Sequence, residues 1–490
     1  MTPETSSAQH ERRWLILAMV AVAQLMVVLD ATIVNIALPS AQHALGFSND
    51  SRQWVVTAYA LAFGSLLLLG GRIGDYFGRK QALIAGLIGF AVASALAGVA
   101  QSLGMLVAAR ALQGAFGALL APSALSILTT AFTDPGERGK AFGIYGAIAG
   151  GGGAIGLLLG GVLTQYIDWR STMFVNLVFA IPAAAAAVVL LTSERPASRP
   201  RLDLPGVASA TAGLFALVYG FSNAETHGWG APLTVGSLAA GAVLLVSFVV
   251  LQARGEHPLL PLRVVLDRDR GASFGAMAIA GSGSFGVFLF LTYYLQRNLG
   301  FSPIKTGVAF LPMMGAVVTS ATLMSTRILP RTGPRPLVPT GMLLAGFAML
   351  ALTRVGVHTS YASHVLPSLL VLGVGMGMIF APSMATATGA VDPHDAGVAS
   401  ALVNTMQQVG GSIGVALLST FSATAATSFV ASHGGPAPAT LAAAAVHGYT
   451  TAFWWSAGIF FLGAIFSGAL LRSGAQSQAL SQGMAPAMAH

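Results

Sequence analysis

The feature that most constrains this chain is how little charge it carries and where that charge lies. Only 8% of its 490 residues are charged, against 55% that are hydrophobic, whereas a soluble domain carries about 25% charged residues. A water-soluble fold could not cover its surface with this composition, so we expect the chain to fold in a lipid bilayer. The net charge of +8 then indicates loops that face an anionic membrane surface, and not a nucleic-acid partner.

Charged and turn-forming residues divide the apolar sequence into stretches of the length that a membrane span needs, about 20 residues. The first stretch begins at Trp14 and is too long for the core of a signal peptide. The break between the third and fourth rests on Gln101 to Gly104. The longest loop, 424–447, is rich in Ala, Gly and Pro, and we expect it to be irregular. The fourteen predicted spans are 14–38, 53–70, 81–100, 104–130, 141–166, 172–192, 204–222, 233–253, 272–295, 306–326, 336–353, 365–389, 396–423 and 448–471.

The basic residues test this division into spans. With a cytoplasmic N-terminus, 18 of the 24 basic residues fall in loops assigned to the inside and 5 in loops assigned to the outside, while Arg110 lies within a span. Positive loops stay on the cytoplasmic side, and one missed helix would scramble every later loop. We therefore predict a multi-pass protein of the bacterial plasma membrane with both termini in the cytoplasm.

An internal repeat divides the chain further. GRIGDYFGRK at 71–80 is matched by TRILPRTGPR at 326–335, and Gly153-Ala-Ile-Gly156 is matched at nearly the same offset by Gly411-Ser-Ile-Gly414. Two equivalent six-helix halves are typical of carriers, with the binding site near the midplane. The predicted fold is therefore an all-α polytopic membrane protein with these parts: a cytoplasmic N-terminus 1–13, a six-helix half 14–192, a linker with two extra helices 193–271, a second six-helix half 272–471, and a cytoplasmic tail 472–490.

The sequence gives no sign of enzyme, cofactor or metal chemistry. Cysteine is absent, and the ten histidines do not have the spacing of metal ligands. Gly139-Lys140 is followed by Ala141, and therefore lacks the phosphate-loop pattern. We expect a protein without ATPase activity, cofactor, metal or nucleic-acid partner, and we expect a monomer.

Two charged residues lie deep in predicted spans. Asp30 is about 24 Å from the inner end of its span at 1.5 Å per residue, and burying a charge there costs about 3 kcal/mol. Arg110 lies about 9 Å from the outer end of its own span, close to the depth of Asp30. An intramembrane carboxylate is a functional candidate by default, so we predict that the two residues act in proton coupling. The alternatives are an Asp30 that serves only packing and an Arg110 that extends to the membrane interface.

Two glycine-containing segments are candidates for conformational roles. In the loop at 71–80, glycines allow a tight turn and the charged residues can bond helix ends across the halves, which favours a conformational latch over an ordinary basic loop. Its residues are Gly71, Asp75, Gly78, Arg79 and Lys80. In the fifth span, small residues allow close helix packing, and we predict a further gating role for Gly152, Gly156, Gly160 and Gly161.

The ninth span is rich in aromatic residues that could line an apolar substrate pocket, although anchoring at the membrane interface is an equal alternative. The residues assigned to the pocket are Met26, Gln113, Phe285, Phe288, Tyr293 and Asn404.

These motifs together resemble a known family. Leu29 to Pro39, reading LDATIVNIALP, is similar to the span-one signature of the fourteen-span drug:proton antiporters of the major facilitator superfamily. The loop at 71–80 and Arg110-Ala-Leu-Gln113-Gly114 are similar to further motifs of that group. Trp169-Arg170, Phe174, Asn176, Gly397 to Ser400 and Asn404 to Gly414 extend the resemblance from end to end. One position departs from it, because Leu157 follows Gly156 where the family has proline.

The resemblance implies proton-coupled efflux of small hydrophobic molecules, such as drugs or antibiotics, by alternating access. In that mechanism Asp30 takes up a proton and Arg110, which the resemblance links to proton transfer, tunes it. Two alternatives remain: export of a lipid or an endogenous metabolite by the same fold, and a membrane sensor that transports nothing. The lack of any soluble output domain argues against the sensor.

Overall fold

The described part of the chain is entirely helical. The computed structural model describes residues 3–48, 51–132, 135–192, 203–255, 258–357, 359–389, 391, 396–433, 435 and 437–472, and no β-strand occurs within them. The first eight helices are α1 (Pro3–Leu45), α2 (Gln53–Phe77), α3 (Arg79–Gly98), α4 (Leu103–Ala131), α5 (Pro135–Tyr166), α6 (Ser171–Leu190), α7 (Leu204–His227) and α8 (Pro232–Arg254). The others are α9 (Leu262–Leu266), α10 (Arg268–Tyr293), η1 (Tyr294–Asn298), α11 (Pro303–Leu323), η2 (Met324–Ile328), α12 (Leu329–Thr332), α13 (Pro334–Leu352), η3 (Tyr361–Val365), α14 (Leu366–Thr388), α15 (Ala396–Ser432) and α16 (Pro438–Leu470), where η marks a π-helix.

Most of the long helices can cross a bilayer. Among the described residues, 12 helical segments are long and apolar enough to do so, and two shorter apolar segments occur at Gln53–Leu67 in α2 and Gly152–Tyr166 in α5. The predicted break between the third and fourth spans is confirmed, since α3 ends at Gly98 and α4 begins at Leu103. Ser102 caps α4 by accepting the backbone N–H of Met105 at 3.3 Å, which satisfies one of the free donors at a helix start.

The predicted irregular loop at 424–447 is wrong. Helix α15 continues to Ser432, and α16 already begins at Pro438. The segment 424–432 contains only Ala, Thr, Ser, Phe and Val, with no glycine or proline to end the helix. The first breakers are the Gly-Gly-Pro sequence at 434–436, and Gly435 has a positive φ of 97°.

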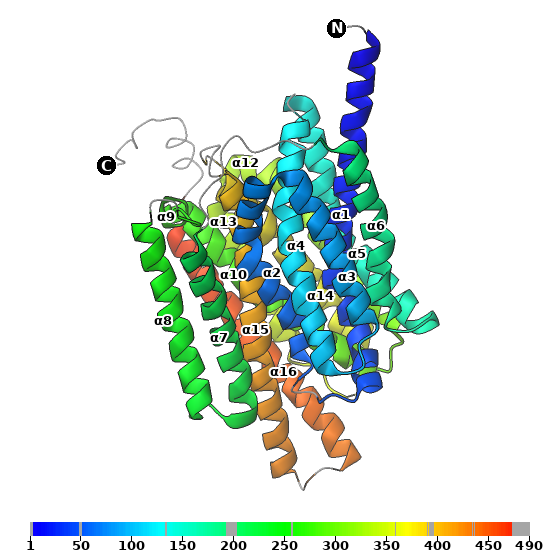
Figure 1. Ribbon diagram of the computed structural model, residues 1–490. Coiled ribbons are helices and arrows are strands. Elements are labelled where there is room, and N and C mark those ends of the chain that lie inside the picture. The colour runs from blue at the N-terminus through cyan, green and yellow to red at the C-terminus, as the bar shows by residue number, and fades with distance from the viewer. Residues whose placement is uncertain are drawn as a thin grey trace, which may run out of the picture. The chain divides into compact units, whose positions relative to one another are not determined.

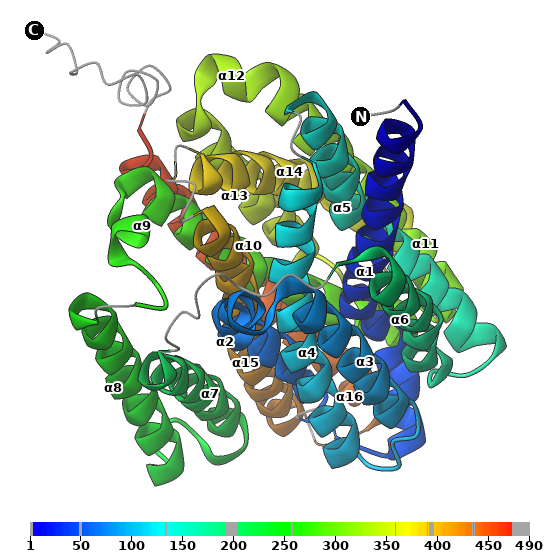
Figure 2. The same cartoon turned by 45° about the horizontal axis from the view of Figure 1, so that its top comes forward.

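The chain forms two compact units. Unit 1 comprises Met1–Thr211, Arg254–Leu259 and Ser302–Val308, and unit 2 comprises Ala212–Ala253, Leu260–Phe301 and Ala309–His490. In unit 1, α1 packs against α4, α5 and α6, and α3 packs against α4 and α6 (Figures 1 and 2). In unit 2, α10 packs against α14, α15 and α16, and α13 against α14 and α16. The same order of packing therefore occurs in each unit.

Glycines bring the paired helices close together in both units. In unit 1, a Cβ on Gly156 of α5 would lie 2.1 Å from the Thr32 hydroxyl of α1. In unit 2, a Cβ on Gly414 of α15 would lie 2.5 Å from the Cα of Ser282 of α10. Without a hydrophobic force between helices in lipid, such close packing of small residues stabilises helix pairs.

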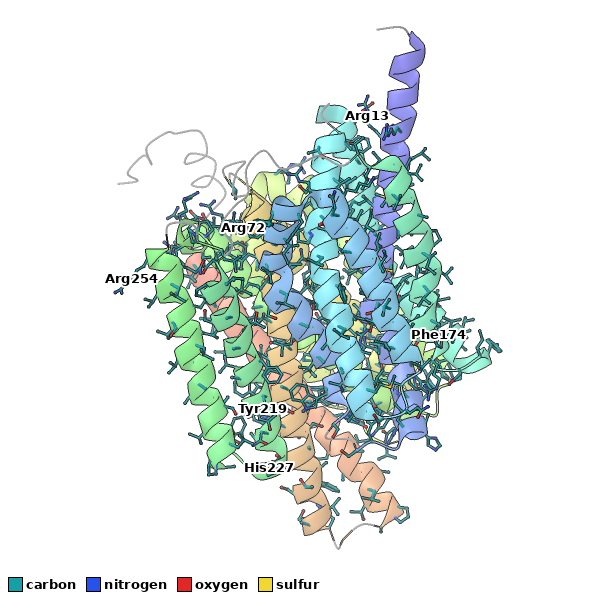
Figure 3. The ribbon with its side chains drawn as sticks, in the orientation of Figure 1. Arg13, Arg72, Phe174, Tyr219, His227 and Arg254 are labelled. Carbon is teal, nitrogen blue, oxygen red and sulfur yellow. The ribbon has the colours of Figure 1, made fainter. Side chains whose placement is uncertain are left out.

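Basic side chains bind carbonyl groups at the exposed ends of helices. The Arg12 guanidinium donates to the Leu190 carbonyl at the end of α6, at 2.9 and 3.2 Å. The Arg268 guanidinium donates at 2.8 Å to the carbonyls of Ala469 and Leu470 at the end of α16. Near the start of α5, Glu137 binds Arg13 of α1 at 3.0 Å, and Arg13 is labelled in Figure 3. Cations at helix C-termini satisfy the last carbonyls and oppose the negative end of the helix dipole.

Candidate functional site

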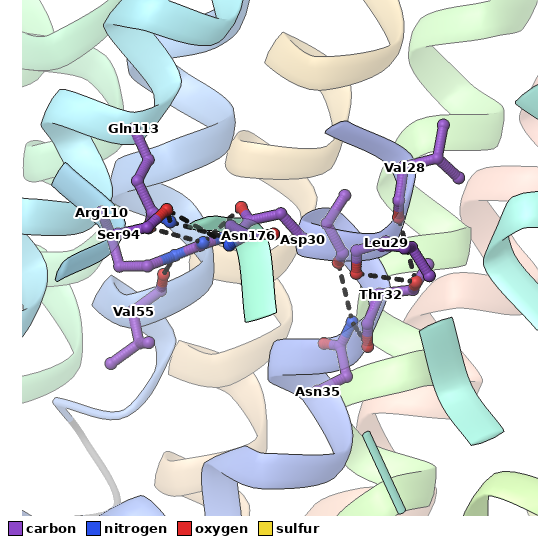
Figure 4. Close-up of polar contacts among 11 residues, drawn as sticks. Val28, Leu29, Asp30, Thr32, Asn35, Val55, Ser94, Arg110, Gln113 and Asn176 are labelled. Atoms are coloured by element: carbon purple, nitrogen blue, oxygen red, sulfur yellow. Dashed lines mark hydrogen bonds and ion pairs between the residues drawn. The ribbon is translucent and has the colours of Figure 1, made fainter. Parts of the chain in front are cut away.

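The deep carboxylate of Asp30 lies in a polar cluster within unit 1 (Figure 4). Its side chain is fully buried, and two helices, α4 and α6, supply its three donors. Arg110 Nη1 of α4 donates to Asp30 Oδ2 at 2.5 Å, while Gln113 Nε2 and Asn176 Nδ2 of α6 donate to Oδ1 at 3.0 and 2.8 Å. Ser94 Oγ of α3 accepts from the same two amides at 2.7 and 3.2 Å. We call Asp30, Ser94, Arg110, Gln113 and Asn176 the carboxylate cluster.

Arg110 is held at several points besides the carboxylate. Its Nη1 donates to Gln113 Oε1 at 2.9 Å, and its Nε donates to the Val55 carbonyl of α2 at 3.2 Å. Its Cζ lies 4.4 Å from the centre of the Tyr59 ring, a cation–π distance. The arginine does not extend to the membrane interface, because its side chain is 1% exposed.

The cluster is electrically balanced. It contains one carboxylate and one guanidinium, and a buried charge is tolerated only when it is paired and hydrogen-bonded. All three donors to Asp30 suit an ionised carboxylate, which accepts but cannot donate. Protonation would remove the charge that these donors satisfy.

Behind Asp30, α1 packs closely on α5. The predicted gating residues Gly152, Gly156 and Gly160 face Val28, Thr32 and Ile33 of α1, where an added Cβ would lie 3.1, 2.1 and 3.0 Å from the nearest atom. Gly161 instead faces Ile304, in the segment Ser302–Val308 of the same unit. The first three glycines form one seam along α1, and their role in gating stays a prediction.

The predicted latch loop is a tight turn inside unit 1. Gly78 has a φ of 104° between α2 and α3, a conformation that L side chains avoid. Gly71 is in van der Waals range of Pro122, with an added Cβ at 3.6 Å from its ring. Arg79 donates to the Ser126 carbonyl of α4 at 3.5 Å, and Lys80 donates to the carbonyls of Val188 and Leu191 at 2.8 and 2.5 Å.

Both cations thus bond carbonyls near helix ends of their own unit, and the expected contact across the halves stays a prediction. The side chain of Asp75 lies outside the described residues. Arg72, which begins the same loop, donates to the Pro258 carbonyl at 3.0 Å. The latch role itself stays a prediction.

The six residues assigned to the substrate pocket belong to two different units. Met26 and Gln113 belong to unit 1, where both are fully buried, and Gln113 is part of the carboxylate cluster. In unit 2, Phe288 lies 5.2 Å from the Phe310 ring, and the ring of Phe285 lies against Gly411. Tyr293 is buried beside Arg297 at 5.3 Å, and Asn404 donates to the Ser400 carbonyl of its own helix at 3.2 Å.

Three residues of this site carry no prediction of their own from the sequence. They are Ser94, Asn176 and Tyr59, and each is a polar side chain in a largely apolar helix. Asn176 had a usable signal, because it is one of the positions that carry the family resemblance. Within the described residues, no group of three or more His, Asp or Glu side chains could hold a metal ion.

The comparison with known proteins decides the family. A sequence profile of the Major Facilitator Superfamily matches residues 20–415. The chain belongs to the major facilitator superfamily. The predicted family is confirmed, and with it a multi-pass membrane transporter of a superfamily that consists of transporters and not of enzymes.

Relatives of this superfamily align over almost the whole chain. The chain is 50% identical to the puromycin resistance protein of Streptomyces alboniger, over 94% of this chain and 92% of that protein. It is 38% identical to the cephamycin export protein of Amycolatopsis lactamdurans, over 86% of each. The tetracenomycin C resistance and export protein of Streptomyces glaucescens is 34% identical, over 84% of this chain and 76% of that protein.

Solved structures agree with the superfamily fold. An autoinhibited peptide transporter of the POT family matches with a TM-score of 0.67 at 17% identity, covering 94% of this chain and 96% of that one. A bacterial homologue of the lysosomal transporter Spinster matches with a TM-score of 0.65 at 17% identity, covering 94% and 97%. The predicted all-α major facilitator fold is thereby confirmed.

Proposed function

We propose that this protein exports small hydrophobic molecules, antibiotics among them, in exchange for protons, and that puromycin is one of its substrates. The observation that carries the proton coupling is the buried pair of Asp30 and Arg110. Membrane proteins rarely keep ionisable groups at depth unless a proton, ion or substrate pathway needs them. The substrate class follows from the relatives, whose names refer to resistance to antibiotics or to their export.

In this mechanism, the Asp30 carboxylate takes up a proton from the outside. The neutral acid no longer attracts the guanidinium of Arg110, and the link between α1 and α4 weakens. Breaking a buried ion pair changes the free energy by about 3–5 kcal/mol, enough to shift a two-state equilibrium by two to four orders of magnitude. Proton uptake and release can therefore bias the transporter between two conformations.

The architecture we propose has fourteen spans, two six-helix halves and two extra helices between them. The distribution of basic residues supports both termini in the cytoplasm of a bacterium and a protein of its plasma membrane. The glycine seam of α5 would let α1 move against α5 as Asp30 changes charge, and the loop at 71–80 would act as a latch. We keep Met26, Phe285, Phe288, Tyr293 and Asn404 as proposed substrate contacts, and a monomer as the proposed functional form.

The test compares two Asp→Asn substitutions in inside-out vesicles that carry the full-length protein. Acidifying the vesicle lumen should drive labelled puromycin into it. Asp30→Asn should reduce this pH-driven accumulation at least about tenfold, because the amide carries no titrating proton. Asp168→Asn is the matched control, since that carboxylate is half exposed beside Arg170 and should leave transport intact.

Unchanged pH-driven accumulation in the Asp30→Asn variant would contradict the coupling role. If puromycin does not accumulate even with the unaltered protein, puromycin is not a substrate. Transport of cationic, neutral and anionic compounds should then be compared. Flipping of a labelled lipid, with none of these compounds transported, would favour the alternative of a lipid exporter.

A further inference from the structure

The amide of Asn176 lies in the carboxylate cluster with one half of its hydrogen-bonding capacity unused. Its Nδ2 donates to Asp30 Oδ1 at 2.8 Å and to Ser94 Oγ at 3.2 Å. The residue is fully buried, yet its Oδ1 has no hydrogen-bond partner among the described residues. A buried acceptor without a donor costs free energy in this state, which suggests that it has a partner in another state.

The other acceptors of the cluster are already engaged. Gln113 Oε1 accepts from Arg110 at 2.9 Å, and Ser94 Oγ accepts from two amides. A protonated Asp30 would bring a new donor into the cluster, since a carboxylic acid carries one O–H. That O–H needs an acceptor in a place that excludes water.

We propose that Asn176 Oδ1 accepts the proton that Asp30 carries. This rests on the proposed role of Asp30 in proton coupling. A proton from water bonds to Asp30 Oδ2, the hydrogen bond from Arg110 to that oxygen breaks, and the new Oδ2–H donates to Asn176 Oδ1. The bond from Asn176 Nδ2 to Asp30 Oδ1 remains. Acid and amide then form a closed pair of two hydrogen bonds, and release of the proton reverses the exchange.

Asn176 therefore acts as a positioning residue that stabilises both protonation states. It donates one of the three bonds to the carboxylate, and it supplies an open acceptor for the acid. Oδ2 exchanges Arg110 for Asn176, so that the guanidinium, still held by Gln113 and Val55, is freed from α1 only when the proton is bound.

Among the described residues, the ionisable groups on the helices around Asp30 are few. On α4 the group is Arg110, and on α2 it is Tyr59, whose ring lies under that guanidinium. On α5, Tyr145 donates to Gln24 of α1 at 2.6 Å, away from the cluster. Helix α6 has no ionisable side chain between Ser171 and Leu190. On α3, the ionisable residues are Arg79 and Lys80 at its start, where they bond carbonyls of other helices.

The test is infrared difference spectroscopy of the purified full-length protein in lipid vesicles, titrated from alkaline to acid pH. The unaltered protein should gain a carboxylic-acid C=O band on acidification, and Asp30→Asn should remove it. In Asn176→Leu the band should move to higher wavenumber, because the acid has lost its two hydrogen bonds with Asn176. The midpoint of its titration should fall by about one pH unit, a tenfold loss of proton affinity, since the acid loses its only acceptor while the carboxylate keeps two of three donors.

Asn35→Leu is the matched control. Asn35 is also a buried amide of the same unit, but its Nδ2 donates to the Ala31 and Thr32 carbonyls of its own helix, so the band and midpoint should not move. If Asn176→Leu does not accumulate, the isosteric pair Asn176→Thr and Asn176→Val carries the test. The hydroxyl of the Thr variant can accept the proton, so its midpoint should lie closer to that of the unaltered protein.

The outcomes separate the two proposals. If acidification produces no band that Asp30→Asn removes, the coupling role of Asp30 is itself wrong. If that band is present and stays at the same wavenumber in Asn176→Leu, the inference about Asn176 is overturned while the role of Asp30 stands. A midpoint that rises would mean that Asn176 serves only as a donor to the carboxylate, and would also overturn it.

Discussion

The helix pair α1 and α4 in unit 1 and the pair α10 and α14 in unit 2 hold their packing partners in the same order but differ in chemistry. Between α1 and α4 lies the ion pair of Asp30 and Arg110, at 2.5 Å. Between α10 and α14, Ser284 Oγ donates a weak hydrogen bond to Met376 Sδ at 3.9 Å. Helix α14 has no charged residue from Leu366 to Thr388, and the charges of α10 are confined to its first turn.

The backbones of the two units differ as well. Among the described residues, all three π-helical segments, η1, η2 and η3, lie in unit 2, next to α10, α11 and α14. Irregular turns of this kind weaken the regular hydrogen bonding of a helix and are frequent at functional sites. Unit 1 thus has a charged core, and unit 2 has an apolar core with π-helical segments beside its helices. In the function we propose, proton uptake takes place in unit 1, and contact with cargo of varied shape suits unit 2.

Removing the charge of Arg110 should have the largest effect on stability and transport, and should show the difference between the two cores most clearly. Arg110→Leu leaves the Asp30 carboxylate buried without its cation, which should lower the unfolding free energy by about 3–5 kcal/mol and abolish proton-driven transport. The matched change in unit 2, Met376→Leu, conserves volume and should cost less than about 1.5 kcal/mol. Denaturant titration in detergent micelles measures both.

A double variant tests whether the charge itself is the cause. Asp30→Asn combined with Arg110→Leu removes both ions and should recover most of the lost stability, while transport stays absent. Equal losses for Arg110→Leu and Met376→Leu would show that the two cores do not differ in the way described.

The depth of Asp30 and Arg110 could be predicted from sequence because it needs only a span boundary and the rise of an α-helix. Both residues break an apolar run, and both were expected at similar depth. The observed ion pair agrees with that similar depth. The same counting placed the break between α3 and α4 at Gln101 to Gly104, where breakers are dense.

The remaining cluster residues could not be found in this way. Depth does not tell which way a side chain points around the helix, and in a membrane both faces of a helix are apolar, so periodicity gives little help. Ser94 and Asn176 therefore look like isolated polar residues. Gln113 was assigned to a substrate pocket, whereas its position three residues after Arg110 on α4 places it beside that guanidinium.

The close glycine contacts between α5 and α1 in unit 1 and between α15 and α10 in unit 2 can be compared next. We expect their substitution to have an intermediate effect on stability. Gly156→Ala places a methyl 2.1 Å from the hydroxyl of Thr32 and should cost about 1–3 kcal/mol, as overpacking does. Thr32→Ala removes that hydroxyl and should restore most of the stability, because the next contacts of the added methyl, with Leu29, are 3.2 Å or longer.

The matched change in unit 2 should not be rescued. In Gly414→Ala the methyl meets the Cα of Ser282 at 2.5 Å, and the backbone cannot be trimmed by a second substitution. Thermal unfolding of the two double variants, Gly156→Ala with Thr32→Ala and Gly414→Ala with Ser282→Ala, checks this. Rescue in both, or in neither, would show that the two seams are packed alike.

The smallest expected effect lies where the two units are most similar, at the ends of α6 and α16. Arg12 and Arg268 are both exposed, and each donates to the last carbonyls of the helix that ends its unit's bundle. Arg12→Gln and Arg268→Gln should each lower the unfolding free energy by about 0.3–1 kcal/mol, and added salt should reduce the difference from the unaltered protein. Because neither side chain touches the carboxylate cluster, both variants should keep the pH profile of transport. A shifted profile in Arg12→Gln alone would mean that the end of α6, which carries Asn176, is coupled to Asp30 through the helix, and that the difference between the units reaches beyond their cores.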